Sequence, residues 1–100
     1  MEVKVASTKD LSAGKMIGVE NSGQKMLVAN INGSFHAIGN VCTHRGCKLS
    51  EGNLNGENVQ CPCHGSVFNV KTGAVVKGPA KNPEKSFKVR VDGDAVLVNI

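Results

Sequence analysis

The sequence predicts an all-β fold, an antiparallel β sandwich or small barrel. Valine supplies 14 of the 100 residues, and asparagine and glycine together supply 22. This combination is typical of short strands joined by tight turns. No stretch of 11 or more residues shows the 3.6-residue apolar period of an amphipathic helix. A chain of 100 residues also corresponds to one domain, which we expect to span residues 1–100.

Seven segments are predicted as strands, because apolar residues alternate in them or because turn residues bound them. In chain order they are residues 3–5, 25–31, 35–41, 58–61, 67–70, 87–91 and 96–98. The second and third are joined by Asn32-Gly33, a dipeptide that favours a type I′ turn and therefore predicts a hairpin.

The last hairpin has the clearest pattern. Residues 87–91 alternate strictly between apolar and basic side chains, and residues 92–94 form a turn. The alternation predicts that Phe87, Val89 and Val91 lie in the core, while the basic side chains between them face water.

Three segments do not fit a strand. Residues 8–11 could form a single helical turn, which Gly14 would end. Residues 42–56 and the neighbourhood of Gly65 are predicted as loops, and both contain cysteine and histidine.

Composition excludes several classes of protein. No apolar run approaches the ~20 residues that span a bilayer, and the first residues lack a signal-peptide pattern, so we expect a cytoplasmic protein without a membrane span. The net charge is +4, and residues 71–90 carry six basic residues against Glu84 alone. This segment is either a basic face for an acidic protein partner or a set of solvated lysines. Nucleic acid is excluded as a partner, because Phe87 is the only aromatic residue in this stretch.

Two short motifs bring cysteine and histidine together. The first is Cys42-Thr43-His44-Arg45-Gly46-Cys47, and the second, after 16 residues between His44 and Cys61, is Cys61-Pro62-Cys63-His64-Gly65-Ser66. Each motif offers one thiolate and one imidazole, the donors that suit zinc and iron.

The residues alone leave four interpretations open. Cys42, His44, Cys61 and His64 could hold an iron–sulfur cluster with two cysteines and two histidines, or a structural zinc. Zinc is the poorer fit, because four residues and one residue separate the cysteines within the two motifs, unlike common zinc spacings. A cysteine nucleophile would not explain two matched motifs. In the fourth interpretation all four cysteines are small core residues and the histidines have no functional role. We expect His36, which lies in a predicted strand without a cysteine nearby, to be a structural residue.

The paired motifs resemble the signature of the Rieske 2Fe–2S proteins. The likeness continues through Leu49-Ser50-Glu51-Gly52, Phe68, Thr72-Gly73 and Gly78-Pro79-Ala80, and it is strongest to the soluble Rieske-type ferredoxins. The resemblance implies a one-electron carrier rather than an enzyme, with one 2Fe–2S cluster. It also implies an antiparallel β domain with a cluster-binding subdomain, about residues 40–82, formed by two loops and a proline loop.

The resemblance also implies partners. These would be a reductase as electron donor and an oxygenase or other redox protein as acceptor. Two alternatives remain: a small electron-transfer subunit of an oxygenase or nitrite-reductase system, and a zinc-stabilised interaction domain without redox activity.

The resemblance assigns the cysteines and histidines to two roles. Cys42 and Cys61 would bind one iron, and His44 and His64 the other. The remaining pair, Cys47 and Cys63, would form the disulfide that joins the two loops in the high-potential Rieske proteins.

Five further residues would tune or cover the cluster. Ser66 matches a serine that donates to a bridging sulfide, whereas Phe68 stands where the high-potential proteins carry a tyrosine donor. One donor is kept and one lost, so we expect a reduction potential between the oxygenase ferredoxins and the cytochrome bc Rieske proteins. Gly46 and Gly65 would let backbone amides approach the sulfurs. Pro79 belongs to the proline loop, which excludes water.

The tip of the first motif differs from the quinol-oxidising relatives. Arg45 stands where they tend to place leucine, and Lys48 follows. A cationic tip suits docking on an acidic protein surface, although Arg45 could also be merely exposed.

Overall fold

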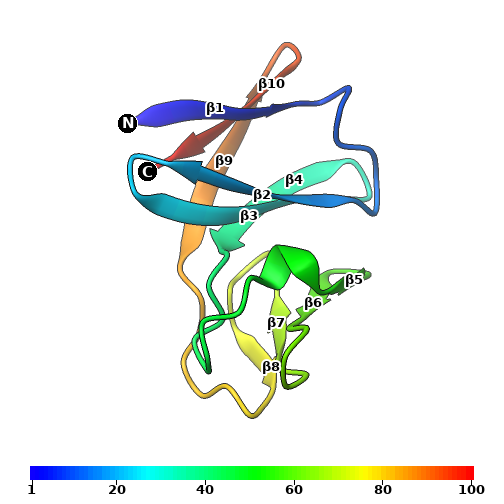
Figure 1. Ribbon diagram of the computed structural model, residues 1–100. Helices are drawn as coiled ribbons and strands as arrows, with labels where there is room; N and C mark the ends of the chain where they lie inside the picture. Colours follow the sequence, from blue (N-terminus) through cyan, green and yellow to red (C-terminus); the bar gives the residue numbers. More distant parts are fainter.

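The computed structural model describes all 100 residues and contains ten strands and one short 3₁₀ helix (Figure 1). The strands are β1 (Glu2–Ser7), β2 (Met16–Asn21), β3 (Gln24–Ile31), β4 (Ser34–Gly39), β5 (Asn53–Asn55), β6 (Asn58–Gln60), β7 (Val67–Asn69), β8 (Val75–Lys77), β9 (Ser86–Asp92) and β10 (Ala95–Asn99). The helix η1 spans Leu49–Glu51. Since η1 has only three residues, the structure offers no helix that could span a bilayer. The predicted all-β class is confirmed.

Six strands form an antiparallel sheet that curves into a nearly closed barrel, in the order β1-β10-β9-β4-β3-β2. The remaining strands form a smaller antiparallel sheet in the order β5-β6-β7-β8. In Figure 1 this smaller sheet and the loops around it lie below the barrel, in the stretch of chain between β4 and β9. The barrel thus forms the base, and the two cysteine-histidine motifs belong to the lower part.

Strand β3 separates two hydrophobic cores, because successive side chains of a strand point to opposite faces. Met26 and Val28 face the barrel core, whereas Leu27, Ala29 and Ile31 face the loop-side core. The barrel core consists of Leu11, Met26, Val28, Ala37, Phe87, Val96 and Val98. The loop-side core consists of Leu27, Ala29, Ile31, Ile38, Cys42, Leu49, Val59, Cys61, Phe68, Val70 and Ala80. The outer face of β3 therefore packs against the loop region through the loop-side core.

Both predicted hairpins are present. Asn32 and Gly33 have φ angles of 53° and 93°, as a type I′ turn requires, and they join β3 to β4. In the last hairpin Ala95 pairs with Asp92, so the turn contains two residues, of which Gly93 has a φ of 60°.

One prediction for the last hairpin is wrong at its end. Phe87 is buried and Val89 is half-buried, but Val91 is 46% exposed. On its other side β9 pairs with β4 only at Ser86 and Phe87. Val91 lies beyond this pairing, near the turn that joins β9 to β10.

The predicted helical turn near residue 8 is also absent. The chain forms only a turn there, closed by a hydrogen bond from the Asp10 N–H to the Ser7 carbonyl at 3.0 Å. Residues 42–56, expected to be loop throughout, contain both η1 and β5. Strands β2 and β8 were not predicted from the sequence, and β4 ends at Gly39, two residues before its predicted end.

Candidate metal centre

The first loop, residues 42–47, is closed by its own backbone. The Cys42 N–H donates to the Cys47 carbonyl at 2.8 Å, and the Gly46 N–H donates to the Cys42 carbonyl at 2.8 Å. Gly46 has a φ of 80°, a conformation that residues with a side chain rarely adopt. Glycine is therefore required for the loop to close.

The second loop, residues 61–66, repeats this pattern. The Cys61 N–H donates to the Ser66 carbonyl at 2.7 Å, and the Gly65 N–H donates to the Cys61 carbonyl at 3.3 Å. Gly65 also has a φ of 80° and, like Gly46, is the fifth residue of its loop. The two motifs are therefore matched in backbone geometry as well as in residue type.

Each loop begins with a free thiol that is 3% exposed, and both thiols belong to the loop-side core. Burial raises the pKa of the Cys42 thiol, and the neighbouring Cys61 thiol raises it further. The N–H groups of His44 and Arg45, which hydrogen-bond to the Cys42 sulfur, act on this pKa in the opposite direction. A bound metal would supply the positive charge that keeps such thiols ionised.

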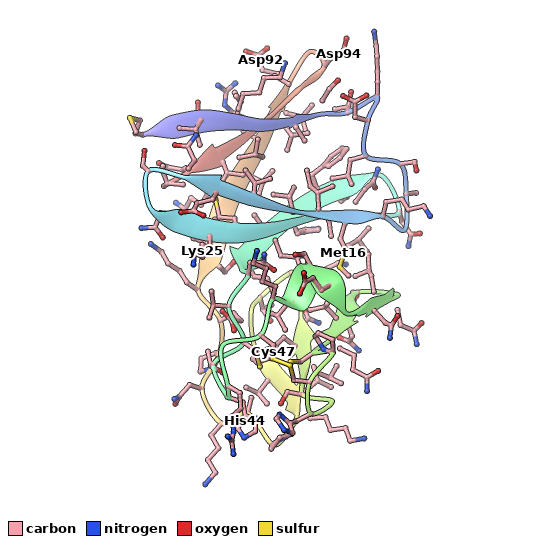
Figure 2. The ribbon with its side chains drawn as sticks, viewed as in Figure 1. Met16, Lys25, His44, Cys47, Asp92 and Asp94 are labelled. Atoms are coloured by element: carbon pink, nitrogen blue, oxygen red, sulfur yellow. A yellow bond between two sulfur atoms is a disulfide. The ribbon has the colours of Figure 1, made fainter.

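The two imidazoles lie beside each other at the outer end of the loops. The ring centroids of His44 and His64 are 5.1 Å apart, and the rings meet edge to face at 88°. His44 is half-buried and His64 is exposed. Figure 2 shows His44 at the end of the molecule that points away from the barrel. The structure thus brings two buried thiols and two accessible imidazoles to one pair of loops, a donor set that fits an iron–sulfur centre.

A disulfide between Cys47 and Cys63 joins the two loops, with 6.4 Å between their Cα atoms (Figure 2). The sulfurs of Cys47, Cys61 and Cys63 all lie within 4.8 Å of one another, so the bridge lies against the buried Cys61 thiol. Because Cys47 and Cys63 are bonded to each other, they are not available as metal ligands. Cys42 and Cys61 are the free cysteines.

Ser66 connects the second loop to the proline loop, residues 78–80. Its fully buried hydroxyl oxygen accepts a hydrogen bond from the Ala80 N–H at 3.0 Å. The hydroxyl proton is therefore left to donate elsewhere. Phe68 is fully buried in the loop-side core, and Pro79 is exposed.

The two cationic residues predicted for docking, Arg45 and Lys48, are both exposed. Neither takes part in any ion pair of the structure. Their charges are therefore free to meet a partner.

His36 lies in β4, apart from the two loops, as expected for a structural residue. Burial lowers its pKa, Lys71 lowers it further, and Glu57 acts in the opposite direction. Its Nε2 atom is buried without a hydrogen-bond partner.

Sequence reasoning missed Glu84 as part of the site. This side chain is 8% exposed, and its carboxylate accepts a hydrogen bond from the Thr43 N–H at 3.1 Å. Burial raises the pKa of Glu84 from 4.5 to about 7, and the Thr43 hydrogen bond acts in the opposite direction. The unfolded chain releases the Glu84 proton at a lower pH than the folded chain does. The free energy of unfolding therefore falls as the pH rises from 4.5 to about 7. The only signal in the sequence was a single acid in a strongly basic segment.

Comparison with known proteins gives the family. The Rieske [2Fe-2S] domain family matches residues 1–91 of the chain. The chain belongs to this family. This Rieske chain is 38% identical over 97 residues to "Biphenyl 2,3-dioxygenase, ferredoxin component" of Rhodococcus jostii (strain RHA1), a match that covers 97% of the chain and 91% of the relative.

Solved structures match the fold equally well. The ferredoxin of carbazole 1,9a-dioxygenase from Nocardioides aromaticivorans IC177 superposes with a TM-score of 0.94 and 32% identity, covering 98% of this chain and 96% of that one. A chain from a complex of reduced oxygenase and oxidized ferredoxin in carbazole 1,9a-dioxygenase superposes with a TM-score of 0.93 and 35% identity. That match covers 97% of this chain and 91% of the other.

These matches confirm three expectations. The cofactor of this Rieske chain is a [2Fe–2S] cluster rather than zinc. The chain is an electron carrier and not itself a catalyst, because its relatives are ferredoxin components. Its partners are redox proteins.

The disulfide closes a loop between residues 16 apart, which by chain entropy stabilises the folded state by about 3 kcal/mol. We expect the double variant Cys47→Ser/Cys63→Ser to lose the visible absorbance of its cluster at a lower urea concentration than the oxidised parent protein. A thiol reductant should lower the parent's midpoint to the same value and leave the variant unchanged. Equal midpoints for the oxidised parent and the variant would contradict this role.

Proposed function

We propose that this chain carries single electrons from a reductase to a terminal oxygenase, through a cluster held by Cys42, His44, Cys61 and His64. The observation that carries the proposal is the pair of buried thiols beneath a pair of accessible imidazoles on two matched loops. The similarity to ferredoxin components of dioxygenases supports an oxygenase as the acceptor.

Each pair of ligands has its own task in this proposal. Cys42 and Cys61 anchor the cluster to the loop-side core, where water has little access. His44 and His64 hold its outer side, and their rings reach the surface that a partner can approach. When bound, the cluster takes up and releases one electron.

Two residues, Ser66 and Phe68, set the reduction potential that we propose for the cluster. The buried Ser66 hydroxyl, with its oxygen already accepting from Ala80, donates its proton toward the cluster and favours the reduced state. Phe68 is equally buried but has no hydroxyl to donate. We therefore place the reduction potential between those of the oxygenase ferredoxins and the cytochrome bc Rieske proteins.

We propose that residues 1–100 act as one domain, in which residues 40–82 form the cluster-binding subdomain. The shared wall of β3 and β4 supports this proposal, because the loop-side core is built on it. We propose that the protein acts in the cytoplasm together with its redox partners.

The ligand set is tested by changing each ligand separately. We expect Cys42→Ser, His44→Asn, Cys61→Ser and His64→Asn each to abolish the intact cluster, because each removes one of four ligands. His36→Asn is the matched control, since His36 has no place in the loops. The measurements are iron and acid-labile sulfide per chain and the electron paramagnetic resonance signal, which should appear only on reduction.

The parent protein and the His36 variant should contain the iron and sulfide of one [2Fe–2S] cluster per chain. A ligand variant that keeps the full content and an unchanged signal would remove that residue from the set.

Arg45 and Lys48 are proposed to dock the protein on an acidic partner surface. Both are exposed, unpaired and carried by or directly beside the first loop. Attraction between opposite charges across such an interface speeds association and is screened by salt.

We expect electron transfer to the oxygenase of the Rhodococcus jostii biphenyl 2,3-dioxygenase system to slow as salt rises. The variant Arg45→Ala/Lys48→Ala should be slower at low salt and less sensitive to salt. As a matched control, Lys4→Ala/Lys88→Ala removes the same charge from exposed positions on the barrel strands. Stopped-flow rates that do not depend on salt, or two double variants that behave alike, would contradict docking through the tip.

A further inference from the structure

Glu84 lies in a space that two glycines leave open. A Cβ atom on Gly39 would lie 2.5 Å from Glu84 Oε1, and a Cβ on Gly73 would overlap the Glu84 carbonyl oxygen. The Glu84 N–H donates to the Gly73 carbonyl at 2.8 Å. The contacts with Gly73 fix the backbone of Glu84, and Gly39 leaves room for its carboxylate.

The other carboxylate oxygen holds the first loop. Glu84 Oε2 accepts a hydrogen bond from the Thr43 N–H at 3.1 Å, and the Thr43 hydroxyl donates to the Asn82 carbonyl at 2.6 Å. Thr43 is therefore held at two points by the segment that follows the proline loop. It is also the residue between Cys42 and His44.

We propose that Glu84 is a positioning residue: its carboxylate orients the Cys42–Thr43 peptide and thereby aims both ligands of the first loop. The inference rests on the ligand set proposed above. No ligand-loop contact of this kind is made on the second loop, whose Ser66 hydroxyl is tied to Ala80 instead.

A contribution to stability does not explain this residue. Glu84 is buried and takes part in none of the ion pairs of the structure. A buried carboxylate without a cation is costly, and leucine in the same space would avoid that cost. What leucine cannot do is accept the hydrogen bond from Thr43.

The test compares Glu84→Leu with Glu84→Gln in the cluster-loaded protein. Glutamine keeps an acceptor oxygen and removes the charge, whereas leucine removes both. The measurements are the rate of iron loss to a chelator, the line shape of the electron paramagnetic resonance signal of the reduced protein, and the reduction potential. We expect Glu84→Leu to lose iron about fivefold faster, as the loss of one hydrogen bond implies, and to show an altered line shape. Glu84→Gln should match the parent in both.

The reduction potential separates charge from position. At a pH well above the Glu84 pKa of about 7, where the parent carries the charge, a shift common to both variants reports the lost charge, and a further shift in Glu84→Leu alone reports the lost acceptor.

Gly39→Ala provides a second route to the same effect. Its Cβ would displace the far end of the Glu84 side chain, and Gly39 does not have a positive φ that would strain an alanine. We expect Gly39→Ala to lose iron as fast as Glu84→Leu and to show the same altered line shape. If Glu84→Leu does not fold, Gly39→Ala provides the test of the proposal. Glu20→Leu, which changes an exposed carboxylate on β2, is the control and should resemble the parent.

The proposal would be overturned if Glu84→Leu, Glu84→Gln and Gly39→Ala all showed the same line shape and the same iron-loss rate as one another. A parent protein without a reduced-state signal would instead overturn the ligand set, so the two failures are distinguishable.

Discussion

The structure depends on the burial of two thiols next to each other. Cys42 and Cys61 come from loops far apart in the sequence, and burial disfavours the ionised form of the Cys42 thiol. A metal held by both thiols, as in the ligand set proposed above, would supply the positive charge that keeps them ionised. The small sheet and the segments between β4 and β9 bring the two loops together and keep water away from the thiols.

Three features of the fold meet this requirement. The outer face of β3 supplies Leu27, Ala29 and Ile31 as an apolar floor beneath the thiols. Matched backbone turns, each closed through a glycine, give the two loops the same shape. The disulfide then ties the loops together on one side, and hydrogen bonds from Thr43 and Ala80 tie them to the proline loop and the segment after it.

The sequence was informative where a local rule decides the structure. Asn32-Gly33 specifies its turn by itself, and the spacing of the cysteines and histidines identified the two loops. The sequence did not predict features that depend on contacts between segments far apart along the chain. Strands β5 and β8 are short, and β5 is mostly asparagine, so only pairing with their neighbours makes them strands. Glu84 reads as one acid among lysines until the fold brings Gly39 and Gly73 around it.

We infer that the metal completes a loop region that the barrel alone does not order. Hydrogen exchange measured by mass spectrometry on the cluster-loaded and the metal-free protein, with the disulfide intact in both, tests it most directly. Removal of the metal should speed exchange across residues 42–66, while the β9–β10 hairpin keeps its protection. Loops that remain equally protected without the metal would contradict it.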